Sequence, residues 1–181
     1  MAQAFFGGVH PHDMKAATNE KAIEQLAPPA TVVIPMSMHF GAPCTPIVKV
    51  GDQVKVGQKI GEASGFISAN VICSVSGTVK AVEMRRVASG AMVNSIVVTN
   101  DGEYNTVEGL GADRDPSTLS KQDIRTIVKE AGIVGLGGAG FPTNVKLSPK
   151  DENAIDYILL NGAECEPYLT SDYRLMMEAP E

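Results

Sequence analysis

The chain has 181 residues with 44% hydrophobic and 20% charged residues, values near the globular averages, so a disordered chain is not expected. A net charge of −6, few aromatic residues and no Trp argue against nucleic-acid binding, which needs a basic surface and stacking side chains. The three cysteines, Cys44, Cys73 and Cys165, are widely separated, so we expect small buried apolar side chains rather than disulfides or a metal cluster. No apolar run approaches the roughly 18 residues of a membrane span.

The first 30 or so residues have no clear periodicity. His10 and His12 flank a proline, but no third metal ligand is near them, so a hydrogen-bonded loop is expected. From residue 31 to about 99, short β-branched runs alternate with glycine turns, which predicts a small β sandwich or barrel. The predicted strands include 31–34, 46–50, 71–75, 78–82 and 96–99. The side chains expected in its core are Val48, Val50, Val54, Ile60, Val75, Val79 and Ile96.

A weak internal repeat supports this β module. Residues 47–60 and 79–96 both read as strand, turn, glycine and short strand. This plan resembles the barrel-sandwich hybrid of the lipoyl- and biotinyl-carrier folds. The carriers need a lysine at an exposed hairpin tip, whereas the corresponding stretch, residues 63–70, has none. We therefore reject a carrier role and expect a scaffold or docking element.

A helix is predicted after the polar linker at 104–116. Ser120 suits the N-cap, Asp123 completes an imperfect capping box, and Gly132 is placed to end the helix in the left-handed conformation. Its apolar face is formed by Ile124, Ile127, Val128 and Ala131. Further on, residues 155 and 157–160 predict a buried strand, so the helix, the intervening loop and the strand form an α/β unit.

Five of the nine residues from 132 to 140 are glycine. Residues 135–140 match G-x-G-x-x-G, but a Rossmann fingerprint must follow a strand and open a helix, and here a helix precedes it and Pro142 follows. Such a loop still lets backbone N–H groups approach a flat ring or a phosphate, and Lys146 could neutralise a phosphate. The residues alone do not decide between this site and a turn without a ligand.

A second cluster, Asn161, Glu164 and Glu166, follows the predicted strand, at the end where open α/β sheets bind ligands. The two carboxylates could accept hydrogen bonds from a heterocycle or from ribose hydroxyls. A solvated acidic turn is the equally weighted alternative.

Together, residues 137–143 with Lys146 and residues 161–167 resemble the flavin-binding subunit of respiratory NADH dehydrogenase. The resemblance is closer to the RnfC family, the NADH-side subunits of ion-translocating ferredoxin:NAD oxidoreductase complexes. Residues 7–11, residues 35–43 with His39, and residues 161–173 also look like RnfC, so the resemblance covers essentially the whole chain.

The resemblance implies FMN in the glycine loop, NADH stacking on the FMN, and two 4Fe-4S clusters in a later part of the protein. The residues that would line the flavin and nucleotide pocket are Gly135, Gly137, Gly138, Gly140, Phe141 and Lys146. Asn161, Glu164 and Glu166 would hydrogen-bond the flavin or the nucleotide. Leu136 replaces an arginine of the respiratory enzyme, and neither a catalytic side chain nor a metal ligand is expected in this chain.

The resemblance further implies a mixed α+β chain. Residues 1–110 would form an extended segment plus the barrel-sandwich hybrid, and residues 111–181 would begin an α/β FMN/NADH-binding domain. We expect an N-terminal fragment that alone holds no cofactor and is inactive.

The intact protein would be a peripheral electron-transfer subunit on the cytoplasmic side of the cell membrane, with no membrane span and no nucleic acid. It would work with the other subunits of an Rnf-type complex and indirectly with ferredoxin. The alternatives are a non-catalytic docking module and an RnfC-like NADH-dependent electron donor to a soluble reductase. The coupling ion, the direction of electron flow and the oligomeric state stay open.

Overall fold

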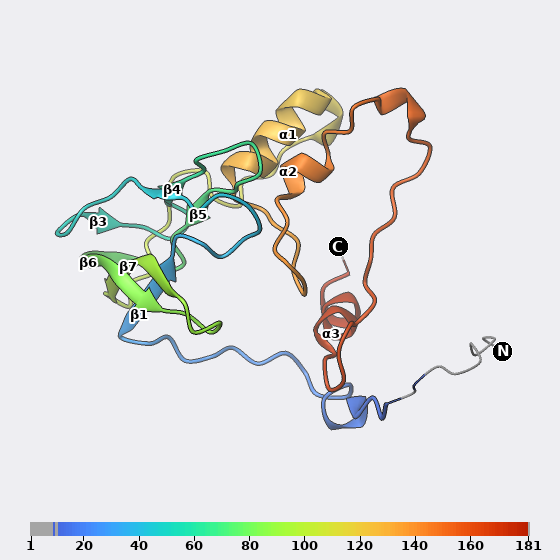
Figure 1. Cartoon of the computed structure of the whole chain (residues 1–181), viewed down its shortest axis with the longest axis horizontal. Helices are drawn as coiled ribbons and strands as arrows, with labels where there is room; N and C mark the ends of the chain where they lie inside the picture. The colour runs from blue at the N-terminus through green and yellow to red at the C-terminus, as the bar shows by residue number, and fades with distance from the viewer. Residues whose placement is uncertain (1–8, 10, 181) are drawn as a thin grey trace. The chain divides into compact units, whose positions relative to one another are not determined.

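The computed structural model describes residue 9 and residues 11–180, so the predictions at Gly7, Gly8 and His10 lie outside the described residues. The chain divides into two units. One is Ala27–Ala154, and the other combines Met1–Leu26 with Ile155–Glu181 (Figure 1). Each unit is described separately below.

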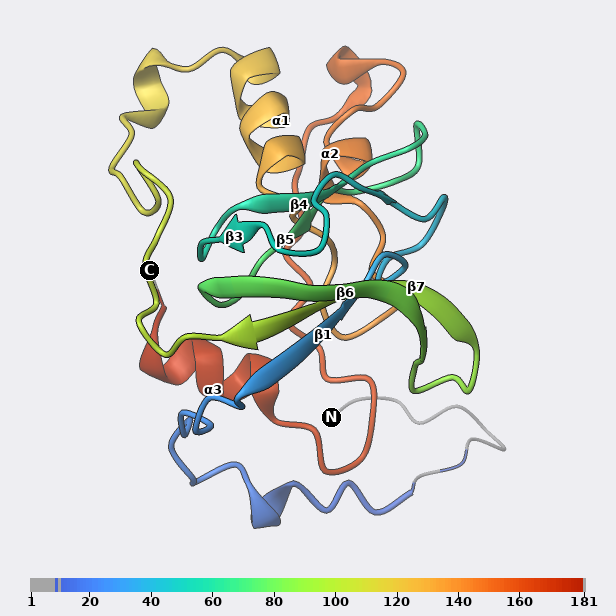
Figure 2. The same cartoon turned by 90° about the vertical axis from the view of Figure 1, so that its left-hand side faces the viewer.

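The unit Ala27–Ala154 contains two antiparallel sheets (Figure 2). The first has the strand order β1-β7-β6-β3 and the second β2-β4-β5. Their bounds are β1 (Thr31–Pro35), β2 (Thr45–Pro46), β3 (Gln53–Val54), β4 (Lys59–Glu62), β5 (Val71–Ile72), β6 (Gly77–Arg86) and β7 (Met92–Asn100). The central pair β6 and β7 runs in register from Gly77 opposite Asn100 to Arg86 opposite Met92, with one irregularity between Val79 and Ala81. The predicted β module is confirmed.

The hydrophobic core takes side chains from both sheets. Its buried members are Ile34, Met36, Cys44, Val54, Ile60, Val71, Cys73, Val75, Val79, Ile96 and Val98. Burying each of the larger aliphatic side chains stabilises the fold by about 1.5–3 kcal/mol. Five of the predicted core positions are among these residues, and Val48 packs against them partly buried.

Val50, predicted in the core, is instead 61% exposed. The strand expected over 46–50 extends only over Thr45–Pro46, and Val50 enters a turn. Gly51 has φ 91, and the Asp52 carboxylate accepts a hydrogen bond from the Lys49 backbone N–H at 2.9 Å. This turn directs the valine away from the core.

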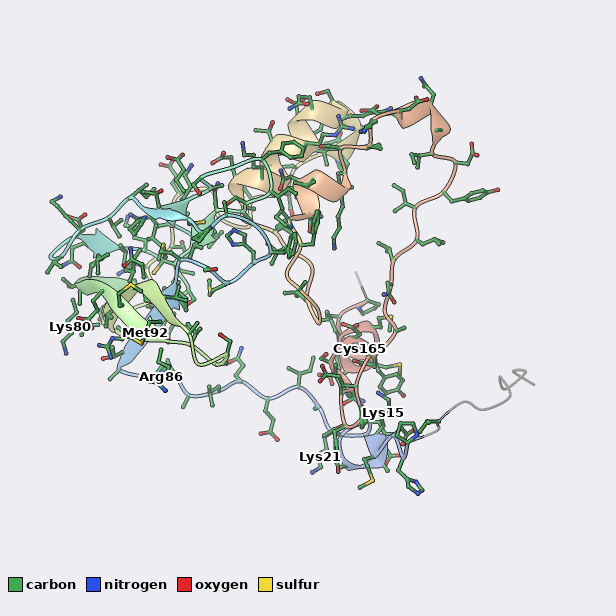
Figure 3. The ribbon with its side chains drawn as sticks, viewed as in Figure 1. Lys15, Lys21, Lys80, Arg86, Met92 and Cys165 are labelled. Carbon is green, nitrogen blue, oxygen red and sulfur yellow. The ribbon has the colours of Figure 1, made fainter. Side chains whose placement is uncertain are left out.

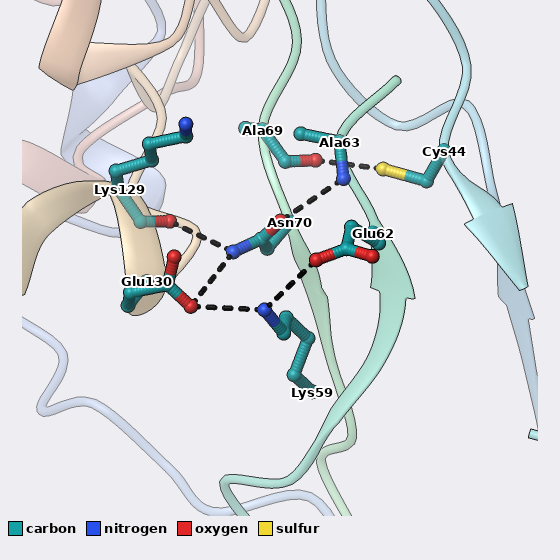
Figure 4. Close-up of polar contacts among 8 residues, drawn as sticks. All are labelled: Cys44, Lys59, Glu62, Ala63, Ala69, Asn70, Lys129 and Glu130. Carbon is teal, nitrogen blue, oxygen red and sulfur yellow. Dashed lines mark hydrogen bonds and ion pairs between the residues drawn. The ribbon is translucent and has the colours of Figure 1, made fainter. Parts of the chain in front are cut away.

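The predicted helix is α1 (Lys121–Glu130), and both halves of the capping box between Ser120 and Asp123 are present. Gly132 ends it with φ 65, as expected. A 3-10 turn, η2 (Pro116–Thr118), precedes α1, and the short helix α2 (Thr143–Lys146) and a second 3-10 turn, η3 (Glu152–Ala154), follow it. The last turn of α1 is tied to the β module through Asn70 and Lys59 (Figure 4).

The other unit contains the 3-10 turn η1 (Lys15–Ala17) and the helix α3 (Ser171–Glu178). The strand predicted over 157–160 was wrong: these residues have no strand assignment, and Leu159 and Leu160 are 91% and 95% exposed. A strand needs a hydrogen-bonded neighbour, and no described strand pairs with this segment. Within the described part of the chain, no helix is long and apolar enough to cross a membrane.

Candidate functional site

The glycine loop is a closed hairpin whose two ends are held by backbone contacts. Val134 forms an isolated antiparallel bridge with Pro142. The Gly135 N–H donates to the Phe141 carbonyl at 2.9 Å, and the Thr143 N–H donates to the Ile133 carbonyl at 3.0 Å. The loop between α1 and α2 therefore has a defined conformation, with residues 136–139 exposed at its tip.

The glycines of this loop have different roles. Gly140 is buried with φ 65, and a Cβ atom there would lie 3.1 Å from the Met38 carbonyl oxygen and 3.2 Å from the His39 Cα. This glycine is required for packing. A Cβ atom at Gly137 or Gly138 would meet no atom of the described residues within 4 Å, so the space above these two residues is open. The tip, rather than the whole loop, can receive a flat or anionic group.

Lys146 and Phe141 lie at the base of the same loop. A Cβ atom on Gly135 would be 2.7 Å from the Lys146 Nζ, so the ammonium group lies against the loop backbone. Phe141 stacks on Phe40, with ring centroids 5.7 Å apart and an interplanar angle of 26°. The Phe40 N–H also donates to the Gly140 carbonyl at 3.1 Å. Phe40 thus anchors the loop, a role that the sequence did not indicate.

Asn144, in α2, is a candidate that sequence reasoning missed. Its Oδ1 atom is buried and has no hydrogen-bond partner among the described residues. A buried acceptor without a partner is costly unless a ligand or water satisfies it. The available signal was an amide side chain two residues after Pro142, at the start of the element that also carries Lys146.

The acidic cluster belongs to the other unit. The Glu164 Oε1 accepts a hydrogen bond from the Tyr173 N–H at 3.0 Å, while its Oε2 is buried without a partner among the described residues. The Asn161 side chain accepts from the Ala163 N–H at 3.0 Å, which shapes the turn before Glu164. An open depression of about 190 Å³ adjoins this turn, lined by Pro11, Asp13, Lys15, Glu164, Cys165, Glu166 and Pro167.

The structure therefore groups the predicted site residues in two sets. Gly135, Phe141 and Lys146 gather around the glycine loop, and Glu164 and Glu166 line the depression of the second unit. Asn161 shapes the same turn but does not line the depression. That both sets form one flavin and nucleotide pocket stays a prediction.

The cysteines divide differently from the expectation. Cys44 and Cys73 are buried, and desolvation raises the pKa of both thiols. The Cys44 thiol donates to the Ala69 carbonyl at 2.7 Å. Cys165 is exposed between the two glutamates, so the prediction that it is buried was wrong. The neighbouring Glu164 carboxylate is bonded to the Tyr173 N–H, and Cys165 lines the depression at the surface.

The fold and the loop define a two-sheet β module followed by a helix and a glycine loop that is open at its tip. The model of the RnfC barrel sandwich hybrid domain matches residues 3–103, and that of the Nuo51 FMN-binding domain matches residues 128–181. The first match spans more than half of the chain, so the chain belongs to the RnfC family.

Several curated relatives are similar to this chain over nearly its whole length. The C subunit of the Na(+)-translocating ferredoxin:NAD(+) oxidoreductase complex of Acetobacterium woodii is 48% identical over 186 residues, covering 98% of this chain and 40% of the relative. Its counterpart in the proton-translocating ferredoxin:NAD(+) oxidoreductase complex of Clostridium ljungdahlii is 46% identical, and the match covers 98% of this chain and 39% of the relative. The C subunit of the ion-translocating oxidoreductase complex of Rhodobacter capsulatus is 43% identical, and the match covers 97% of this chain and 34% of the relative. The chain thus spans about two fifths or less of these three proteins.

Proposed function

We propose that the protein carrying this chain is an electron-transfer subunit of an ion-translocating ferredoxin:NAD oxidoreductase complex. It would exchange electrons between NADH, FMN and two 4Fe-4S clusters in its remaining part, at the cytoplasmic face of the membrane. The observation that supports this most directly is the open tip at Gly137 and Gly138, on a loop whose base lies against the Lys146 ammonium group, inside a segment that matches an FMN-binding domain.

The residues present fit a flavin mononucleotide. The open space above Gly137 and Gly138 admits a planar ring or a phosphate, and Lys146 supplies a charge-assisted hydrogen bond to a phosphate oxygen. Asn144 Oδ1 offers an unsatisfied acceptor on the adjoining helix. Bound FMN would supply the hydride and single-electron chemistry, while these side chains position it and set its electrostatic surroundings.

The acidic cluster is proposed to bind the nucleotide. Glu164 is already oriented by the Tyr173 N–H, and its second oxygen, which has no partner among the described residues, would accept a hydroxyl or N–H of NADH or of the flavin. Glu166 and Asn161 would contribute further acceptors. In this proposal, residues 1–110 and 111–181 correspond to the scaffold and the beginning of the flavin domain. The exposed apolar run 157–160 would then pack against the rest of that domain.

The ultraviolet–visible spectrum of the full-length protein, as purified, tests the function. We expect flavin and iron–sulfur absorbance, with the flavin band bleached by anaerobic addition of NADH. A protein without flavin that still co-purifies with complex subunits would contradict the proposal and support a docking module. Genes for a soluble reductase beside this one, in place of a membrane complex, would support the soluble electron donor.

A further inference from the structure

The N-terminal segment and the acidic loop are joined by hydrogen bonds across a long stretch of sequence. The Tyr168 N–H donates to the Asp13 carbonyl at 2.7 Å. The Lys15 ammonium donates to the Leu169 carbonyl at 2.5 Å, over 154 positions, and lies 3.4 Å from the Glu166 carbonyl oxygen. Lys15 and Cys165, the centre of the acidic cluster, line the same depression (Figure 3).

A second set of contacts extends this junction toward α3. The Thr170 hydroxyl, buried at the start of the helix, donates to the Thr18 hydroxyl at 2.9 Å. The Thr18 hydroxyl in turn donates to the Tyr168 carbonyl at 3.0 Å. Beyond them, Arg174 donates to the Asn19 carbonyl at 3.1 Å, and the Glu178 carboxylate accepts from the Ile23 N–H at 3.1 Å. Side chains of the N-terminal segment thus bond to backbone groups of the C-terminal segment, and side chains of the C-terminal segment bond to backbone groups of the N-terminal one.

Backbone strain is concentrated at the same junction. Among the described non-glycine residues, only Met14, Tyr104 and Tyr168 have positive φ, with values of 54°, 53° and 67°. Met14 lies between Asp13 and Lys15, and Tyr168 itself bonds to Asp13. Strained conformations of this kind persist only where the surrounding contacts hold them, and they cluster at functional sites.

We infer that residues 13–23 form a clasp that holds the loop at 164–170 in its ligand-binding conformation, with Lys15 as the central positioning residue. Lys15 lines the same depression as Glu164 and Glu166, and its ammonium group donates to loop carbonyls. It therefore holds the loop backbone from which the two carboxylates project. The identity of the ligand rests on the proposed function, whereas the clasp itself does not.

The test compares Lys15→Met, Lys15→Arg and Lys21→Met in the full-length protein. Lys21 lies in the same segment and is exposed, with no side-chain partner among the described residues, so Lys21→Met is the matched control (Figure 3). Hydrogen exchange of the amides at 164–170 is measured on flavin-depleted protein, and KM and kcat for NADH on the loaded protein. We expect Lys15→Met to speed exchange about tenfold and to raise KM about tenfold with little change in kcat. Lys15→Arg should keep the exchange rate and the KM close to those of the unmodified protein, and Lys21→Met should change neither the exchange rate nor the KM.

The two measurements separate the possible failures. Unchanged exchange in Lys15→Met would overturn the clasp, whatever ligand the site binds. Faster exchange with an unchanged KM would overturn the positioning role of Lys15. If the unmodified protein binds neither flavin nor NADH, the proposed function fails while the exchange comparison still decides the clasp. Thr18→Val, which keeps the side-chain volume and removes two hydrogen bonds, should speed exchange at the same amides if Lys15→Met does not fold.

Discussion

The Asn70 side-chain amide donates a hydrogen bond to the Lys129 carbonyl at 3.2 Å, in the last turn of α1 (Figure 4). The carbonyls of a last helical turn lack a partner further along the helix. The Lys129 carbonyl accepts from the Gly132 N–H at 3.1 Å, and the β module supplies a second donor to it. On its other side, the Asn70 Oδ1 accepts from the Ala63 N–H at 3.0 Å. The loop that holds a modified lysine in the carrier folds is here fixed to a helix.

Replacing Asn70 should therefore lower the free energy of unfolding. Asn70→Ala removes these two contacts and a longer one to the Glu130 carboxylate at 3.5 Å from a residue that is 6% exposed, so a loss of about 1–3 kcal/mol is expected. Asn70→Asp keeps the acceptor for Ala63 but turns a carboxylate toward the Lys129 carbonyl and the Glu130 carboxylate, so it should destabilise more. Urea unfolding at constant m-value measures both. Asn94→Ala, an exposed site on β7, serves as the control, and an equal loss there would contradict the role of Asn70.

The glycine that ends α1 is the next test of this junction. A Cβ atom on Gly132 would lie 2.3 Å from the Asn70 carbonyl oxygen, at a φ of 65°. We expect Gly132→Ala to cost at least about 2 kcal/mol, because strain and a backbone clash add. Gly51→Ala is the matched control: φ is 91°, but no atom of the described residues lies within 4 Å, so only about 1 kcal/mol of strain should appear. If thermal unfolding shows the same loss of stability in Gly132→Ala and Gly51→Ala, the predicted clash with the Asn70 carbonyl oxygen contributes nothing.

The loop glycines separate binding from folding. Gly138→Val enters open space, so the unfolding free energy should stay within about 0.5 kcal/mol of the unmodified protein while flavin retention is lost. Gly140→Val meets Met38 and His39 and should lower both stability and flavin content. Flavin released by acid precipitation, measured per mole of full-length protein, gives the occupancy. Full occupancy in Gly138→Val would identify the loop as structural.

Lys146 should contribute to flavin affinity through its charge. Lys146→Ala is expected to weaken FMN binding by about 1.5–3 kcal/mol, the usual value of a hydrogen bond to a charged group. The loss should shrink when riboflavin replaces FMN, because riboflavin has no phosphate. Lys150→Ala removes an exposed lysine four residues later and should leave both affinities unchanged. Equal losses for FMN and riboflavin would contradict a phosphate contact.

Glu152 makes stability depend on pH. It pairs with Lys121 at 2.9 Å and with Arg125, which joins η3 to α1. Hydrogen bonds from Lys121 and then Arg125 lower the pKa of the carboxyl. A carboxyl group whose pKa is lower in the folded state than in the unfolded state stabilises the fold at pH values above its unfolded-state pKa of about 4.3. This stabilisation is lost as the pH falls through the folded-state pKa.

Glu152→Gln should therefore unfold at lower urea than the unmodified chain at pH 7, and the difference should narrow below about pH 4. High salt should also reduce this difference in stability, because the ion pair between Lys121 and Glu152 is partly exposed and is therefore screened. Glu108→Gln, at an exposed carboxylate without an ion pair to any described residue, is the control. A difference that is constant from pH 7 to pH 3 would exclude this linkage.

The sequence predicted the elements whose causes are local. The capping box at Ser120 and the left-handed Gly132 depend on neighbouring residues, and the structure has both. The strand at 31–34 was predicted from its β-branched residues, and it forms because β7 pairs with it. The predicted strand at 157–160 depends instead on a partner strand, which no periodicity encodes.

The candidate site was predictable in part for the same reason. The glycine run is visible in the sequence, but only the structure separates the packed Gly140 from the open Gly138. Phe40, stacked on Phe141, and Lys15, bonded to Leu169, act across about 100 and 154 positions. Such pairings follow from the three-dimensional path of the chain, so the residues gave no local signal for them.

The pairing of residues 13–23 with residues 164–170 also sets an order of events during synthesis. The whole unit Ala27–Ala154 is translated between the two segments. At about 5–20 residues per second, the N-terminal segment leaves the ribosome on the order of ten seconds before its partner. The β module has time to fold in that interval, whereas residues 13–23 cannot form their hydrogen bonds with residues 164–170 until the later segment has been synthesised. A nascent chain stalled before residue 164 would therefore display a folded barrel with a free N-terminal arm.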